Sequence, residues 1–367
     1  MGYEVKVIHS QAVYPGFLYL IAKLFREKIA SWTGAVVFTE KDKEDKFYIM
    51  DGVKVYRFPI FKIIPHAKYT KKVIKKQVEK IIQIIKNDDF IPDIITGHFS
   101  NPQLEIIYNL KQTYASRTCL VMHDTGDSIK NIYKQNYPKY FENIDIWGFR
   151  SKSIQIGFER IFGKQKQFFL CYSGIPEVYI LQINKRDFCS DLNKFVYAGD
   201  LIKRKNPIAL IYAIKDVYPN KNYHITYVGK GAEEANIRIT IDSFKINDNI
   251  SFIGHIPRND LLQIFDDSDC FIMISKGEAF GLVYLEAMGR GCITIGSRNE
   301  GIDGVIQHSI NGFLCEAGNP NELSDIIRQI NSLTPAERKQ ISQNAITTAK
   351  ELNDFSAARV YINALSD

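Results

Sequence analysis

Short apolar runs alternate with longer amphipathic segments along almost the whole chain. In the first half, the expected strands are residues 5–9, 35–39, 53–58, 93–97, 119–123 and 168–172. In the second half, they are residues 195–199, 224–229, 250–254, 270–274 and 292–296. The segments between these runs have a helical period, as in 17–29 and 101–114. This alternation predicts an α/β fold with parallel sheets and helices on both faces.

The period loosens between residues 176 and 193, where Pro176 and Glu177 follow Ser173-Gly174. We therefore expect two doubly wound, Rossmann-like domains that face each other across a cleft. Their predicted limits are 1–173 for the first domain, 174–193 for a linker, 194–350 for the second domain and 351–367 for a C-terminal helix. Doubly wound sheets bind ligands outside the carboxyl ends of their strands, so the cleft is the expected site.

The most informative motif runs from Ser275 to Gly289. A strand is expected to end near Ser275 and a helix to begin near Gly281, and the first N–H groups of such a helix can bind a diphosphate. Glu278 and Glu286 stand eight residues apart and are both expected to face the cleft. Carboxylates accept hydrogen bonds from sugar and ribose hydroxyls. A helix start with a dipole-favoured Glu278 and a salt-bridged Glu286 explains the same pattern without any ligand.

Two further stretches follow expected strands. Lys203, Arg204 and Lys205 are consecutive and precede a helix with Pro207 in its first turn. Cations at this edge of a sheet suit a diphosphate leaving group, although a solvated basic loop is the commoner explanation. The Gly229-Lys230-Gly231 stretch lacks the third glycine of a dinucleotide fingerprint, so it is a weak signal by itself.

In order and spacing, these stretches resemble the large family of retaining GT-B-fold glycosyltransferases, the family 4-like group of bacterial capsule, O-antigen and phosphatidylinositol mannosyl transferases. The pair Glu278 and Glu286 is similar to its Glu-x7-Glu motif, and Lys205 to its phosphate-binding lysine. Blocks at 252–257, 296–301 and 311–314 are similar as well. The resemblance implies donor contacts from Gly16, Arg204, Lys205, Gly229, Ile256, Glu278, Phe280, Gly281, Leu282 and Glu286.

The first half resembles the family more loosely. Residues 92–98 are similar to a family strand that ends in a histidine, which places His98 on the acceptor side. His123 ends a strand whose histidine touches the donor sugar in the family. The resemblance implies an acceptor-binding first domain, a nucleotide-sugar-binding second domain and a C-terminal helix that crosses back to the first. Asp200 stands where members usually carry a diphosphate-binding arginine, which leaves Lys203 or Arg204 for that role.

The resemblance therefore implies a metal-independent retaining glycosyltransferase, with His123, Glu278 and Lys205 in catalysis. Its donor is expected to be a nucleotide sugar, with UDP preferred and GDP as the alternative, and its acceptor a saccharide or lipid-linked saccharide. No cofactor is expected. A non-catalytic nucleotide-sugar-binding partner in polysaccharide assembly and a nonhydrolysing sugar-nucleotide epimerase remain alternatives. A nicotinamide oxidoreductase would need G-x-G-x-x-G after the first strand, and residues 10–16 lack it.

Composition adds limits on compartment and partners. The six cysteines form no C-x-x-C pair and lie mostly in apolar runs, which indicates reduced thiols in a cytoplasmic protein. The net charge of +6 on 367 residues is mild, and no nucleic-acid partner is expected. One amphipathic helix presents four lysines off its apolar stripe: Lys71, Lys72, Lys75 and Lys76. These lysines either are a solvated face or hold the protein at the anionic inner face of a membrane.

Overall fold

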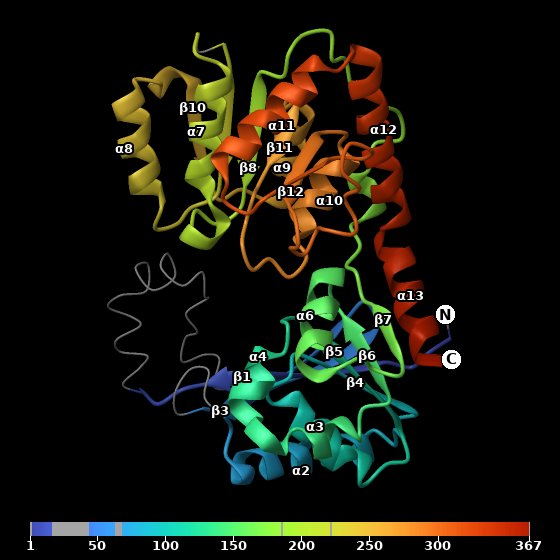
Figure 1. Ribbon diagram of the computed structural model, residues 1–367. Helices are drawn as coiled ribbons and strands as arrows, with labels where there is room; N and C mark the ends of the chain where they lie inside the picture. Colours follow the sequence, from blue (N-terminus) through green and yellow to red (C-terminus); the bar gives the residue numbers. More distant parts are fainter. Residues whose placement is uncertain (1, 17–43, 63–67, 185, 221, 367) are drawn as a thin grey trace. The chain divides into compact units, whose positions relative to one another are not determined.

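The computed structural model describes residues 2–16, 44–62, 68–184, 186–220 and 222–366 (Figure 1). The chain divides into two compact units. Unit 1 comprises Met1–Gly148 and Gln165–Gln167, and unit 2 comprises Phe149–Lys164 and Phe168–Asp367. Within the described ranges, no helix combines the length and the apolar character that crossing a bilayer requires.

The first sheet of unit 1 has the strand order β1-β3-β2. Strands β1 (Lys6–Val13) and β3 (Val53–Phe61) are parallel, with Val7 opposite Val55. Strand β2 (Lys46–Met50) pairs with β3 in the antiparallel direction. The strand expected at 35–39 lies outside the described residues.

The prediction missed strand β2, because all five of its side chains are exposed and its sequence has no alternating pattern. A two-residue turn at Asp51 and Gly52 joins it to β3, and both residues have a positive φ, of 50° and 80°. Such turns match the twist of the strands that they connect, and a residue pair of this type favours a hairpin.

Helix α2 (Lys71–Asn87) packs its apolar stripe into unit 1. The Thr70 hydroxyl caps the helix by accepting a hydrogen bond from the Val73 N–H at 3.3 Å. Ile74, Val78, Ile81 and Ile85 are buried in a cluster that also includes residues of β3 and α3. The expected amphipathic helix is therefore present, and its stripe serves the core of the unit.

The remaining strands of unit 1 are β4 (Ile94–His98), β5 (Arg117–Met122) and β6 (Ile146–Phe149), neighbours in that order, with the boundary between the units at the last residue of β6. Strands β4 and β5 are parallel, so both end at the same edge. The helical segments of this part are α3 (Gln103–Lys111), α4 (Asp127–Tyr133), η2 (Lys134–Asn136) and α5 (Pro138–Phe141).

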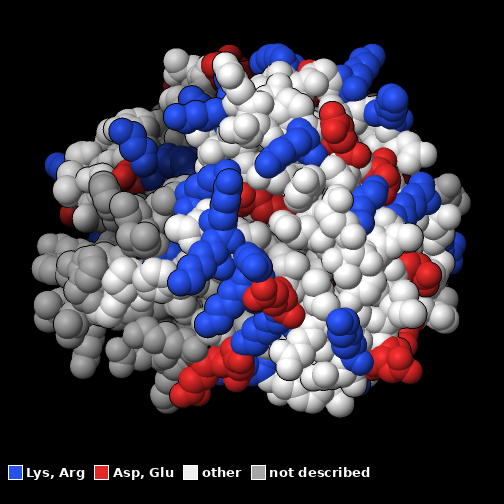
Figure 2. All heavy atoms as spheres, turned by 90° about the horizontal axis from the view of Figure 1, so that it is seen from below, with Lys and Arg blue, Asp and Glu red and all other residues white. Residues whose placement is uncertain are grey.

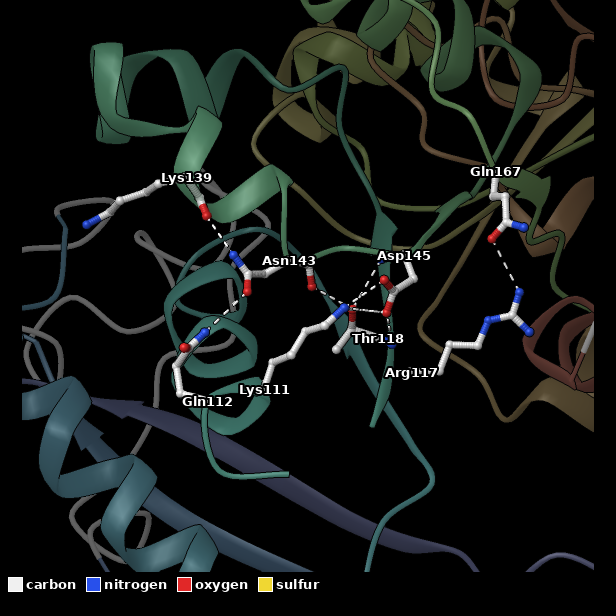
Figure 3. A network of polar contacts seen from close by, with 8 residues as sticks. All are labelled: Lys111, Gln112, Arg117, Thr118, Lys139, Asn143, Asp145 and Gln167. Carbon is white, nitrogen blue, oxygen red and sulfur yellow. Dashed lines mark hydrogen bonds and ion pairs between the residues drawn. The ribbon is translucent and has the colours of Figure 1, made fainter. Parts of the chain in front are cut away.

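A polar network joins α3, β5 and the segment before β6 (Figure 3). Lys111 Nζ lies 2.6 Å from both carboxylate oxygens of Asp145. The Thr118 N–H donates to Asp145 Oδ2 at 2.8 Å, and the Thr118 hydroxyl donates to the Asn143 carbonyl at 2.6 Å. One carboxylate thus ties three segments at the edge opposite the strand ends.

Unit 2 contains a parallel sheet of six strands in the order β10-β9-β8-β11-β12-β13. In chain order this is 3-2-1-4-5-6, the doubly wound arrangement of dinucleotide-binding sheets. The strands are β8 (Lys194–Ala198), β9 (His224–Val228), β10 (Ile250–Gly254), β11 (Cys270–Ile272), β12 (Ile293–Ser297) and β13 (Phe313–Cys315). The five strands expected here are confirmed, and β13 was missed.

Helices follow the strands of unit 2 and bury their apolar sides against the sheet (Figure 1). They are α7 (Pro207–Val217), α8 (Glu234–Phe244), α9 (Arg258–Asp266), α10 (Leu282–Gly289), α11 (Pro320–Ser332) and α12 (Pro335–Glu351). The last helix, α13 (Asp354–Ser366), follows α12 and adds no residue to this core. The unit also holds α6 (Lys152–Phe162), β7 (Phe168–Leu170) and the short 3-10 turns Glu177–Tyr179, Lys203–Lys205 and Asn247–Asn249. Phe195, Phe271 and Ile293 are fully buried between the layers.

The predicted linker at 174–193 falls inside unit 2, where the described residues are irregular apart from one 3-10 turn. Ile175 is tied to the C-terminal segment, because its N–H donates to the Leu352 carbonyl at 3.2 Å. Helix α13 lies against β7, with the rings of Tyr361 and Phe169 edge to face at 5.5 Å. The division of the chain into compact units does not show which segment is a hinge. The linker and the crossing of the C-terminal helix to the first domain therefore stay predictions.

Candidate functional site

The strand order of the unit 2 sheet reverses between β8 and β11. Open α/β sheets bind ligands outside the carboxyl ends of the strands at such a point, because neighbouring loops there turn to opposite faces and leave a crevice. The loops after β8 and β11 are joined. The Lys276 N–H donates to the Arg204 carbonyl at 2.6 Å, and Asn206 Nδ2 donates to the Ile274 carbonyl at 2.9 Å. Two motifs that are distant in sequence therefore meet at this point.

Two cations face Glu278 across these loops. Lys205 Nζ lies 3.7 Å and Arg204 Nη1 lies 3.8 Å from Glu278 Oε2. The Lys205 and Glu278 side chains are each 14% exposed, whereas that of Arg204 is 49% exposed. Glu278 Oε2 is buried and has no hydrogen-bond partner. The loose ion pair between two poorly solvated groups leaves both able to hydrogen-bond a ligand.

The main chain of Glu278 is held by the loop after β12. Its N–H donates to the Glu300 carboxylate at 3.0 Å, and the Gly301 N–H donates to the Glu278 carbonyl at 2.9 Å. A Cβ at Gly301 would lie 2.4 Å from the Phe280 nitrogen, so only glycine permits this approach. The sequence analysis included Glu300 in the block at 296–301 but did not predict a role for this residue in the site.

Helix α10 begins directly after Gly281, which has a φ of +84°. A Cβ there would lie 2.5 Å from the Tyr284 ring, whose hydroxyl donates to the Met273 carbonyl at 2.6 Å. The tyrosine thus fixes the start of the helix at the carboxyl end of β11, with the main chain of Leu282 in the first turn. Phe280 is 2% exposed and its ring stacks on Tyr172 at 5.3 Å, so the ring is not available to a ligand.

Glu286 lies on α10 with a side chain that is only 3% exposed. Its Oε1 is 2.5 Å from Arg258 Nε, at the start of α9. Burial raises the pKa of Glu286, and the Arg258 guanidinium acts in the opposite direction. The salt-bridged arrangement considered from sequence is therefore present, with Arg258 as the partner. Half-buried Ile256 lies two residues before that arginine.

Gly229 has a structural role at the end of β9. A Cβ there would lie 2.0 Å from the Gly199 carbonyl oxygen, at the end of the neighbouring strand β8. Any other residue would separate these two strand ends. The glycine is required for close backbone approach, whether or not a ligand binds beside it.

The predicted residues of unit 1 form a second group. His98 ends β4 and His123 follows β5, and their Nδ1 and Nε2 atoms are 3.1 Å apart. The Phe99 ring, on a residue with a φ of +66°, stacks on His123 at 3.8 Å. Gly16 is exposed, three residues beyond the end of β1. The pairing of the histidines follows from the parallel register of β4 and β5, which spacing in the sequence does not reveal.

Residues 181–348 match the family model of the glycosyl transferases group 1. This group 1 segment contains the loops after β8 and β11 and the start of α10. Over 248 residues, the chain is 27% identical to N-acetyl-alpha-D-glucosaminyl L-malate synthase of Bacillus anthracis, a match that covers 64% of each protein. Over 348 residues, it is 23% identical to the amylovoran biosynthesis glycosyltransferase AmsK of Erwinia amylovora, covering 90% of this chain and 84% of AmsK.

Solved structures show the fold. The HepE protein of Anabaena in complex with UDP has a TM-score of 0.71 at 17% identity, covering 99% of this chain and 100% of HepE. A trehalose-6-phosphate synthase, studied for glycosyl transfer with retention, has a TM-score of 0.67 at 13% identity and 98% coverage of both chains. The chain has the GT-B fold. The group 1 match covers residues 181–348, which lie in unit 2.

Proposed function

We propose that this protein transfers a sugar from a UDP-sugar to a saccharide or lipid-linked saccharide acceptor, with retention of configuration. The observation that carries the proposal is the convergence of Lys205, Glu278 and the start of α10 at the β8–β11 reversal. A cation, a carboxylate and free helix N–H groups are what a sugar diphosphate needs. UDP is the preferred nucleotide because HepE was solved with UDP, and GDP is the alternative.

Each group of the site has a separate task in this proposal. Lys205 and the main-chain N–H groups at Gly281 and Leu282 hold the diphosphate. Glu278 accepts hydrogen bonds from hydroxyls of the donor sugar, and Glu286 accepts them from the ribose. The 3.7 Å gap between Lys205 and Glu278 suits this division, because neither group is committed to a short hydrogen bond with the other.

In the proposed reaction, the bond between the anomeric carbon and the diphosphate oxygen breaks first. The charge that develops on the diphosphate is stabilised by Lys205 and by the N-terminus of α10. The acceptor hydroxyl then attacks the anomeric carbon from the face that the diphosphate leaves, and its proton passes to the diphosphate. His123 contacts the donor sugar in this proposal, and His98 lies on the acceptor side.

The proposal includes neither a metal ion nor a cofactor. A screen of UDP, GDP and other nucleotides by thermal shift tests the donor first, because a ligand that binds only the folded state raises the melting temperature. Hydrolysis of the selected sugar nucleotide is then measured with EDTA. Turnover that needs added Mg²⁺ or Mn²⁺ would contradict the metal-free mechanism. Nucleotide binding without any turnover of donor would support the non-catalytic partner instead.

The lysines of α2 extend the proposal to a peripheral location at the inner face of a membrane. Lys71, Lys72, Lys75 and Lys76 are exposed, and the face seen from below carries a cluster of Lys and Arg side chains (Figure 2). The apolar stripe of the helix is buried in unit 1, so attraction to lipid would rest on charge alone. Anionic headgroups provide such attraction, and they accompany lipid-linked acceptors.

A further inference from the structure

Arg258 is a partly exposed residue that contacts the buried carboxylate of Glu286. It is the first residue of α9, follows Pro257, and has a side chain that is 48% exposed. Its Nε approaches Glu286 Oε1 to 2.5 Å, although the Glu286 side chain is only 3% exposed. The contact is a close ion pair that is not aligned as a hydrogen bond, and Oε1 has no other hydrogen-bond partner. A carboxylate in such surroundings is costly unless a charge compensates it.

The other cations around this helix have different partners. Arg290, directly after the last residue of α10, donates from its Nε to Asp266 at 2.8 Å. Arg204 and Lys205 lie closest to Glu278. In the part of the chain that the structure describes, Arg258 is therefore the cation that compensates Glu286.

We propose that Arg258 is a positioning residue that keeps Glu286 ionised and oriented to accept hydrogen bonds from the two ribose hydroxyls of the donor nucleotide. This inference rests on the proposed function of the site. A carboxylate has about four lone-pair positions, so an arginine on one side of Oε1 leaves room for two hydroxyl donors. Without the arginine, burial favours the neutral acid form of Glu286. A neutral carboxylic acid has fewer acceptor positions than a carboxylate, and no ion pair holds its orientation.

The test compares UDP with 2′,3′-dideoxyuridine diphosphate, which lacks both hydroxyls, by titration calorimetry. We expect the wild-type protein to bind UDP about tenfold or more tightly than the dideoxy analogue, the range for hydrogen bonds to a charged group. In Arg258→Gln, this ratio should fall to within about threefold, through weaker UDP binding and unchanged analogue binding. Arg258→Lys, which keeps the charge, should restore part of the ratio.

Arg328→Gln is the matched control, because Arg328 is also 48% exposed and is paired with a carboxylate, that of Asp216 at 2.6 Å. It should leave the ratio unchanged. If Arg258→Gln weakens UDP and the analogue equally, the arginine acts on another part of the nucleotide or on folding, and the inference is wrong. The inference also fails if wild-type protein binds both ligands equally. If wild-type protein binds neither UDP nor GDP, the proposed function itself fails.

Discussion

Single side chains and glycines of the site are held in place by burial and by close contacts with their neighbours. Lys205 lies beside a carboxylate with little solvent around either group. Gly281 and Gly301 allow main-chain approaches that a Cβ would block. Charge and backbone shape therefore act together, because the cation is useful only if the helix start beside it stays in place.

Replacing Lys205 by Ala should weaken binding of UDP by about 1.5–3 kcal/mol, the range for a hydrogen bond to a charged group. The loss has two physical sources, since the diphosphate loses a cation and Glu278 loses a neighbour that compensates its charge. Titration calorimetry measures the effect. Lys215→Ala, at an exposed lysine of α7, is the control and should bind UDP normally. Equal affinities for the wild-type protein and Lys205→Ala would exclude Lys205 from the diphosphate site.

Replacing Gly281 by Ala should destabilise unit 2 more than the same change at Gly277. Both glycines have a positive φ, of 84° and 69°, which costs about 1–2 kcal/mol for alanine. Only at position 281 would the new Cβ meet another group, the Tyr284 ring at 2.5 Å, whereas position 277 has open space. Melting temperatures of the two variants measure the difference. If the two variants melt together, the crowding at Gly281 has no energetic consequence.

At the scale of elements, hydrogen bonds to loops decide where strands and helices stand. The loops after β8 and β11 are bonded to each other, and the start of α10 is fixed by Tyr284. In unit 1, Asp145 performs a similar task for α3, β5 and the segment before β6 (Figure 3). Its burial alone would raise its pKa, but Lys111 and Thr118 bind the ionised form, and the net shift is downward.

Because the pKa of Asp145 is lower in the folded protein, its ionised form stabilises unit 1 at pH values above the pKa of an aspartate in the unfolded chain, which is about 3.9. That contribution is lost as pH falls through the folded value. Asp145→Asn should therefore lower the stability of unit 1 at pH 7 by about 0.5–1 kcal/mol, a small value because the Asp145 side chain is 36% exposed and solvent screens its charge. The difference from wild type should shrink below about pH 4.

Tryptophan fluorescence during urea unfolding measures this effect, because Trp147 is buried in unit 1, two residues after Asp145. Asp325→Asn removes an exposed carboxylate, 76% accessible, from unit 2 and is the control. A pH-independent difference between Asp145→Asn and wild type would show that the carboxylate does not act through its ionised form.

At the scale of the whole molecule, the charge is distributed unevenly in a way that the net value of +6 does not show. Helix α2 carries four exposed lysines, and Glu79 lies 3.9 Å from one of them, Lys75. An exposed pair of this kind contributes little, so the lysines keep most of their attraction for anions.

Changing Lys71, Lys72, Lys75 and Lys76 to Gln should abolish binding to anionic vesicles. Each lysine near such a surface is worth about 1 kcal/mol, and the attraction decreases within a Debye length. Co-sedimentation should show binding to anionic vesicles, none to neutral ones, and a steep decrease with salt. A variant with the same charge change at other exposed lysines, Lys164, Lys166, Lys245 and Lys339, should bind normally. Equal binding to anionic and neutral vesicles would instead assign α2 to the scaffold alone.

The α/β class and the motifs can be predicted from sequence, because periodicity and local spacing are encoded within short windows. The sequence located five strands of the unit 2 sheet and the stripe of α2. It did not reveal β2, whose side chains are all exposed, or the short strands β6 and β13, which have four and three residues.

Which groups meet depends on the packing of segments that are distant in sequence. Arg258 reaches Glu286 because α9 and α10 pack together, and His98 meets His123 because β4 and β5 are parallel neighbours. This packing also gives Phe280 a buried ring, where a donor contact was expected from its position in the motif. Such pairings depend on strand order and on the packing of distant segments, and spacing along the chain carries no information about either.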